Sequence, residues 1–136
     1  MLELNKLATA LSNYNELDSI ITSLYQFPTK VQFCHHLTTS FAAHKALDGA
    51  YETLSDLKDN LVEKIIGYSG KRFTTLSLGP LTGYTEAMNT TVANEIIAFG
   101  EKLEEWSKVK DYSDIENLAQ EYSGAGAQLK YLLTLK

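Results

Sequence analysis

Residues 35–64 read HHLTTSFAAHKALDGAYETLSDLKDNLVEK and contain the clearest helical pattern in the chain. A helix is expected from about Phe41 to Ile66, because apolar side chains recur there at helical spacing. These apolar positions are Leu47, Leu54, Leu57, Leu61 and Ile65. A helix with one apolar stripe buries that stripe against other elements, so the segment predicts a packed helical domain.

The flanks of this helix carry start and stop signals. Thr38-Thr39-Ser40 is a short polar and β-branched stretch, and Ser40 is a favourable N-cap. Gly67 and Gly70 are natural terminators at the other end.

A first helix precedes it and is expected to run to about Leu37. Asn13-Tyr14-Asn15 is a place where this helix can break, and Pro28 either kinks it or starts a new one. The apolar positions in this region are Leu4, Leu7, Leu11, Tyr14, Leu17, Ile21 and Leu24.

Two more helices are expected in the second half of the chain. The third runs from about Val92 to Lys108, and the fourth starts at Ser113 with Glu116 completing a capping box. The third helix has Val92, Ile96, Phe99, Leu103 and Trp106 on one face, and the fourth has Ile115, Leu118, Tyr122, Ala125, Leu129 and Leu132. Gly124 and Gly126 lie inside the fourth helix and predict a close helix contact or a kink.

Residues 68–91 are rich in Gly, Thr and Ser and form a long connection between the second and third helices. Phe73, Leu76, Leu78 and Leu81 predict that it packs against the domain. A connection of this length crosses the body of a fold. The expected fold is therefore all-α, a ferritin-like four-helix bundle with a long crossover between helices two and three, in one domain covering residues 1–136.

Composition excludes several classes of protein. The formal charge is −5 and no basic cluster exceeds Lys71-Arg72, so we expect no direct DNA binding. No apolar run approaches the length of a membrane span, and no secretion signal is visible. Cys34 is the single cysteine, which fits a reducing compartment. We expect a soluble, cytoplasmic protein.

Four potential metal ligands lie on one side of the second helix. At 100° per residue, His44, Asp48, Asp59 and Glu63 fall within an arc of about 100° that borders the apolar stripe. The alternative is an ordinary solvated helix face, where the flanking Lys58 and Lys64 screen the carboxylates.

No single ion can use all four ligands of one helix. His44 and Glu63 are about 28 Å apart along the axis, and Asp48 and Asp59 about 16 Å. Two antiparallel copies related by a two-fold axis at the Thr53–Leu54 bond would bring each pair together. His35 or His36 could complete each of the two sites. Imidazole with carboxylate suits Fe(II), with Zn or Mn as alternatives, and the chain has no Glu-x-x-His for a site within one bundle.

Two segments carry a family resemblance. The first contains Phe33, His35, Thr38, Ser40, Phe41, Ala42, His44, Lys45, Ala46, Leu47, Tyr51, Leu54, Leu57, Asp59, Val62 and Glu63, and the second is KYLLTL at 130–135. Both resemble the miniferritins, or Dps proteins, and most closely the short Dps-like proteins encoded by bacteriophages.

The resemblance implies a ferroxidase site shared between two subunits, with iron oxidised and stored. His44, Asp48, Asp59 and Glu63 match the second-helix ligands of that family. The first-helix histidine maps best to His35, and the choice between it and its neighbour His36 stays open. The nine-residue spacing between His35 and His44 is shorter than in typical Dps proteins, and no lysine-rich tail is present.

Two functions follow as expectations. The first is an iron-binding, miniferritin-like homo-oligomer, at least a two-fold dimer and alternatively a shell of twelve, in the cytoplasm of a bacterial host if a phage encodes it. The second is a non-enzymatic helical structural or interaction protein with a vestigial or structural metal site.

Overall fold

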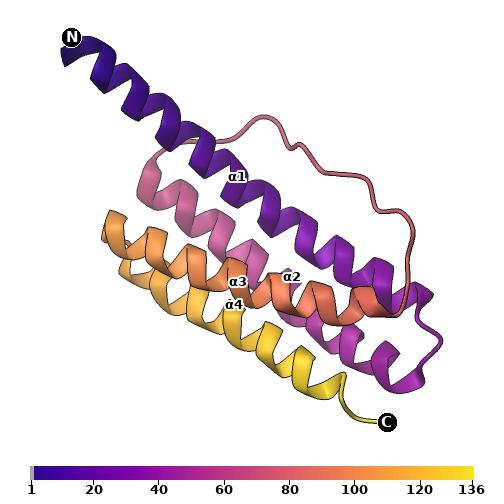
Figure 1. Ribbon diagram of the computed structural model, residues 1–136. Helices are drawn as coiled ribbons and strands as arrows, with labels where there is room; N and C mark the ends of the chain where they lie inside the picture. Colours follow the sequence, from indigo (N-terminus) through magenta and orange to yellow (C-terminus); the bar gives the residue numbers. More distant parts are fainter. Residues whose placement is uncertain (1) are drawn as a thin grey trace.

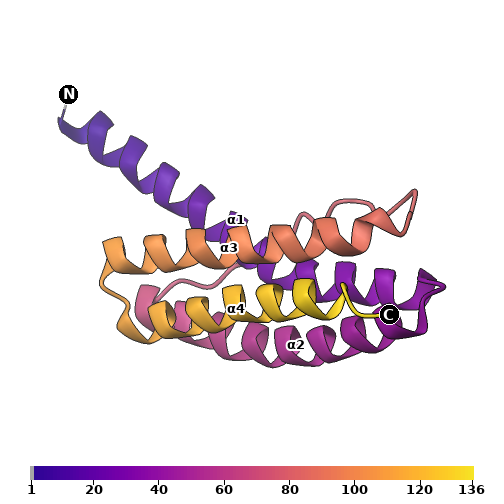
Figure 2. The ribbon, with the colours of Figure 1, turned by 60° about the horizontal axis from the view of Figure 1, so that its bottom comes forward.

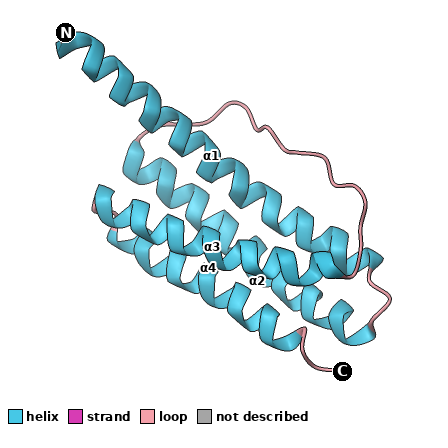
Figure 3. Cartoon of the chain, viewed as in Figure 1, coloured by secondary structure: helices cyan, strands magenta, loops and turns pink. Residues whose placement is uncertain are grey.

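The computed structural model is a bundle of four α-helices, α1 (Leu2–Leu37), α2 (Phe41–Ser69), α3 (Ala87–Lys110) and α4 (Ser113–Leu132) (Figures 1 and 3). The structure describes the backbone from residue 2 to residue 136, and the side chains from residue 16 onward. That backbone contains no strand, so the expected all-α four-helix class is confirmed. Across the same residues, no helix combines the length and the apolar character needed to span a membrane.

The chain is arranged as two helical hairpins joined by a long connection. α1 and α2 form one hairpin through the turn at residues 38–40, and α3 and α4 form the other. The connection, residues 70–86, returns along the bundle beside α1, so α3 starts near the turn between α1 and α2 (Figure 1). α1 packs against α2 and α3, and α4 packs against α2 and α3. The first turns of α1 extend beyond the other helices (Figure 2).

The apolar stripes face a single core. Every stripe residue of α2 and of α3 that the spacing identified is buried there. α4 contributes Ile115, Tyr122 and Leu129 as fully buried side chains, and α1 contributes Ile21 and Leu24. The stripe at Leu4, Leu7, Leu11 and Tyr14 lies outside the residues whose side chains the structure describes.

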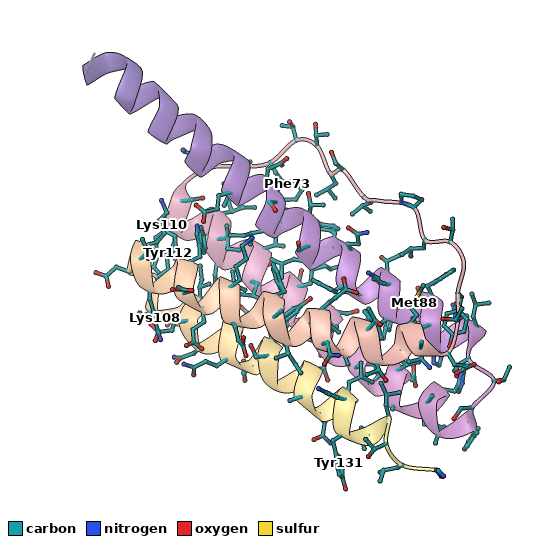
Figure 4. The ribbon with its side chains drawn as sticks, viewed as in Figure 1. Phe73, Met88, Lys108, Lys110, Tyr112 and Tyr131 are labelled. Atoms are coloured by element: carbon teal, nitrogen blue, oxygen red, sulfur yellow. The ribbon has the colours of Figure 1, made fainter. Side chains whose placement is uncertain are left out.

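The connection packs against the bundle, as its apolar residues predict. Phe73 lies edge-on to Tyr25 of α1 with ring centroids 5.8 Å apart, and Tyr84 meets Phe33 in the same way at 6.1 Å. Figure 4 shows Phe73 on the connection beside α1 and Met88 near the far end, where α3 begins. Leu78 is the exception, since nearly half of it is exposed.

Two helix ends differ from the expectation. α2 continues past Gly67 to Ser69 and ends at Gly70, whose backbone is left-handed (φ 70°) and donates to the Ile66 carbonyl at 2.8 Å. A helical glycine costs only about 1 kcal/mol against alanine, so packing of the helix outweighs Gly67. α3 begins at Ala87 rather than Val92, and the Thr91 hydroxyl is satisfied inside it by the Ala87 carbonyl.

Two further local expectations are corrected. The capping box at Ser113 is wrong, because Tyr112 is the N-cap of α4 and no side chain caps the helix. α1 does not break at Asn13-Tyr14-Asn15, and it continues through Pro28 as one helix. At Pro28 tertiary packing outweighs the local signal, since Pro28 and Val31 in the following turn are buried.

A glycine allows α3 and α4 to approach closely. A Cβ atom on Gly126 would lie 2.8 Å from Ile96 Cγ2 and 2.9 Å from the backbone nitrogen of Ile97. The expected close contact is therefore made at Gly126, whereas a Cβ on Gly124 would meet nothing within 4 Å.

We expect Gly126→Ala to lower the free energy of unfolding by about 1–3 kcal/mol, because the backbone of α3 has to move. Gly124→Ala is the matched control and should raise it by up to about 1 kcal/mol, since alanine favours helix and the space is open. Urea denaturation of both variants measures the difference. Equal stability of the two variants would contradict the close approach.

Candidate metal centre

The turn between α1 and α2 brings His35 and His44 face to face. Their rings stack with centroids 3.9 Å apart and planes 18° apart. Nδ1 of His35 lies 2.8 Å from the His44 carbonyl oxygen, and Nδ1 of His44 lies 3.0 Å from the His35 carbonyl oxygen. A carbonyl oxygen only accepts, so both Nδ1 atoms carry hydrogen. In the neutral rings, both Nε2 atoms therefore keep a free lone pair, the form that binds metals.

Hydrogen bonds within the turn and at the adjoining helix ends fix its conformation. Ser40 caps α2, as expected, and its hydroxyl accepts from the Ala43 backbone N–H at 3.2 Å. The Thr38 N–H donates to the Cys34 carbonyl at the end of α1, and the His44 N–H donates to the Ser40 carbonyl, both at 2.9 Å. The nine-residue spacing of the histidines thus corresponds to one helix end, a tight turn and one helix start.

Asp48 lies one helical turn beyond His44, and its side chain is near the imidazole of His35. Its Oδ1 atom is 4.0 Å from Nε2 of His35, and its side chain is half exposed. This distance is too long for a hydrogen bond. Two ligands that each lie about 2.1 Å from one tetrahedral ion are about 3.4 Å apart, so the exposed Asp48 side chain would have to rotate slightly toward His35 to share an ion with it.

The other two predicted ligands, Asp59 and Glu63, are exposed near the opposite end of α2. Because α2 is one continuous helix, they are far from the histidines of the same chain. The two lysines that could screen them are engaged elsewhere. Lys58 Nζ lies 4.9 Å above the ring of Tyr25, and Lys64 Nζ is 3.6 Å from Asp114. Among the side chains from residue 16 onward, neither carboxylate has a cationic group within 4.0 Å.

The five predicted ligands thus lie in two separated groups on one chain. His35, His44 and Asp48 lie at the turn end of α2, and Asp59 and Glu63 lie near its other end. Among the side chains from residue 16 onward, no group of three or more His, Cys, Asp or Glu is placed to hold a metal ion. His36 is exposed beside the pair, whereas His35 is largely covered. Cys34 is buried, which raises its pKa to about 11 and keeps the thiol protonated.

Glu86 binds the turn that carries the histidines, and the pattern of the sequence did not identify it. Its carboxylate accepts from the Thr38 hydroxyl at 2.7 Å and from the Thr39 N–H at 2.9 Å. Asn89 adds a bond from its side-chain amide at 3.2 Å. Glu86 stands 47 residues beyond Thr39, at the start of α3, so no local signal connects them. The bonds from Thr38 and Thr39 lower the pKa of Glu86 below its ordinary value of 4.5, with the Thr38 bond contributing most.

A lowered folded-state pKa means that Glu86 contributes stability above the unfolded value and loses it as pH falls. We expect the difference in free energy of unfolding between the wild type and Glu86→Gln to be largest near pH 7. The difference should shrink as pH falls below about 4.5, where the unfolded-state carboxyl takes up its proton. Urea denaturation from pH 3 to 7 measures this, and a difference independent of pH would contradict the bonded carboxylate.

Comparison with known proteins identifies a family without an assigned activity. A match of 45% identity over 40 residues joins the chain to an uncharacterized 14.6 kDa protein from the mobD-ri intergenic region of Enterobacteria phage T4. It covers 29% of this chain and 31% of the phage protein. No solved structure matches the chain significantly. Residues 35–133 match the model of a family of unknown function, DUF5856, so the chain belongs to that family.

Proposed function

We propose that this protein is a miniferritin-like homo-oligomer that binds Fe(II) between two antiparallel copies of α2 and oxidises it with peroxide or dioxygen. The observation that carries the proposal is the histidine pair, whose Nε2 lone pairs are left free beside Asp48. Iron is the substrate in this proposal, and zinc or manganese would suit the same ligands.

The two groups of predicted ligands complete one another under a single symmetry operation. A two-fold axis through position 53.5 of α2 pairs His44 with Glu63 of the partner subunit and Asp48 with Asp59 of the partner subunit. Leu54 is buried in its own core, so the contact would be made by the outward side of α2. Glu52 and Ser55 lie nearest the axis on that side and pair under the same operation.

Apolar residues flank the ligands with the same symmetry. Phe41 is 74% exposed on the outward side of α2, next to His44. Position 41 pairs with position 66 about the same axis, and Ile66 lies in the same arc of the helix. Burial of Phe41 against Ile66 of the partner subunit would anchor both ends of the contact and exclude water from the metal sites.

The proposed chemistry follows from the ligand set. Two Fe(II) ions supply the two electrons that reduce one peroxide to water, with two protons taken from solvent. Carboxylates from both subunits stabilise the additional positive charge of Fe(III). Each subunit contributes His35, His44 and Asp48 to one site and Asp59 and Glu63 to the other. The proposal includes a cytoplasmic location and a dimer or larger assembly, up to a shell of twelve, and it includes no DNA binding.

The shared site predicts complementation between two inactive variants. One variant carries His44→Ala and Asp48→Ala, and the other carries Asp59→Ala and Glu63→Ala. Each alone should bind no metal at these sites. Random mixing makes half of the dimers mixed, and each mixed dimer has one intact site, so about a quarter of wild-type binding should return. Metal titration after mixing and refolding measures this, and no recovery would contradict a site built from two chains.

Oxidation is tested separately. An anaerobic Fe(II) titration followed by a peroxide or dioxygen pulse should show rapid Fe(III) formation in the wild type and a loss in Asp59→Ala/Glu63→Ala. Bound metal should also raise the free energy of unfolding by about 2.7 kcal/mol at a hundredfold excess over the dissociation constant. An unchanged oxidation rate in the double variant would overturn the proposal. Unchanged stability with metal would favour the non-enzymatic helical protein.

A further inference from the structure

We infer that Glu86 is a positioning residue for the imidazole pair, because it clamps the turn between α1 and α2 and so keeps His35 and His44 in their metal-binding tautomers. The consequence for metal affinity rests on the proposed function. The imidazole geometry does not, since it can be measured in the metal-free protein.

The clamp acts on the residues that separate the two histidines. One carboxylate oxygen of Glu86 accepts from the Thr38 hydroxyl, and the other accepts from the Thr39 N–H and, at 3.3 Å, the Thr39 hydroxyl. Thr38 in turn accepts from the Ser40 N–H through its hydroxyl at 3.2 Å. The turn from Thr38 to Ser40 is therefore tied to the start of α3 rather than held by its own chain alone.

Asn89, which is bonded to Tyr84, holds the Glu86 carboxylate in place. Asn89 is 96% buried, donates to the Glu86 carboxylate and accepts from the Tyr84 hydroxyl at 2.9 Å. The ring of Tyr84 packs edge-on against Phe33, two residues before His35. The carboxylate that binds the turn is thus anchored to α1 and α3 at once.

The histidine pair depends on the spacing that this turn sets. Each imidazole donates from Nδ1 to the carbonyl oxygen of the other histidine, so both bonds require the end of α1 and the start of α2 to stay in register. When the turn opens, each Nδ1 loses its carbonyl acceptor, and the proton is free to move to Nε2. A protonated Nε2 cannot bind a metal ion.

Another carboxylate on α3 provides a matched control. Glu95 also links α3 to α1, through Lys30 at 3.0 Å, but it makes no contact with the turn. Glu95→Ala therefore removes a carboxylate link between the same two helices and leaves the hydrogen bonds from Glu86 to the turn unchanged.

The test uses long-range ¹H–¹⁵N correlation spectra of the imidazoles in the metal-free full chain at pH 8. We expect wild type and Glu86→Gln to show protonated Nδ1 at His35 and His44, because glutamine keeps an oxygen acceptor for Thr39 and its amide N–H can donate to the Thr38 hydroxyl. Glu86→Ala should show mixed tautomers at both histidines, and Glu95→Ala should lower the melting temperature but keep the wild-type spectrum. If Glu86→Ala does not fold, Thr38→Val removes the shortest bond and should shift the spectra in the same direction.

Zinc titration measures the effect of each variant on metal affinity, with Zn²⁺ as a diamagnetic probe. Glu86→Ala should weaken binding by about 10- to 100-fold, the range for residues that orient metal ligands, and Glu86→Gln should restore most of it. A wild-type tautomer spectrum in Glu86→Ala would overturn the inference whatever the metal result. Absence of zinc binding in the wild type would instead count against the proposed function, and the spectra would still decide the role of Glu86.

Discussion

The connection between α2 and α3 has to return the chain along the whole bundle, and the arrangement of the other parts follows from this constraint. It places the start of α3 beside the turn that joins α1 to α2. Without that return, Glu86 could not reach Thr38 and Thr39. Phe73 and Tyr84 hold the connection down by aromatic contacts with α1, which makes the long segment part of the folded structure.

The candidate site combines rigid elements with a ligand set that one chain leaves incomplete. His35 and His44 are constrained by each other's carbonyl groups, while Asp48, Asp59 and Glu63 remain exposed on α2. Lys58 lies over the ring of Tyr25 and Lys64 pairs with Asp114, so neither lysine forms an ion pair with Asp59 or Glu63. The exposed side chains of Asp48, Asp59 and Glu63, with a spacing symmetric about the middle of α2, are the physical basis of the proposed shared iron site.

Helical spacing was a reliable guide wherever burial decides the structure. The stripes of α2 and α3 all entered the core, because an apolar face of that length has no other stable environment. Local end signals were less reliable. Gly67 did not stop α2, and Ser113 did not cap α4, because each signal is worth about 1 kcal/mol and packing of neighbouring turns outweighs it.

Periodicity alone determined the four helices, the order of their apolar faces and the symmetric spacing of His44, Asp48, Asp59 and Glu63. These are properties of one helix at a time, and residue spacing is enough to define them. The stacking of His35 on His44, the exposure of His36, and the hydrogen bonds of Glu86 to the turn were decided only by the tertiary structure. They join residues across a turn or across 47 positions of chain, and the free energy that selects them arises only when the helices are packed together.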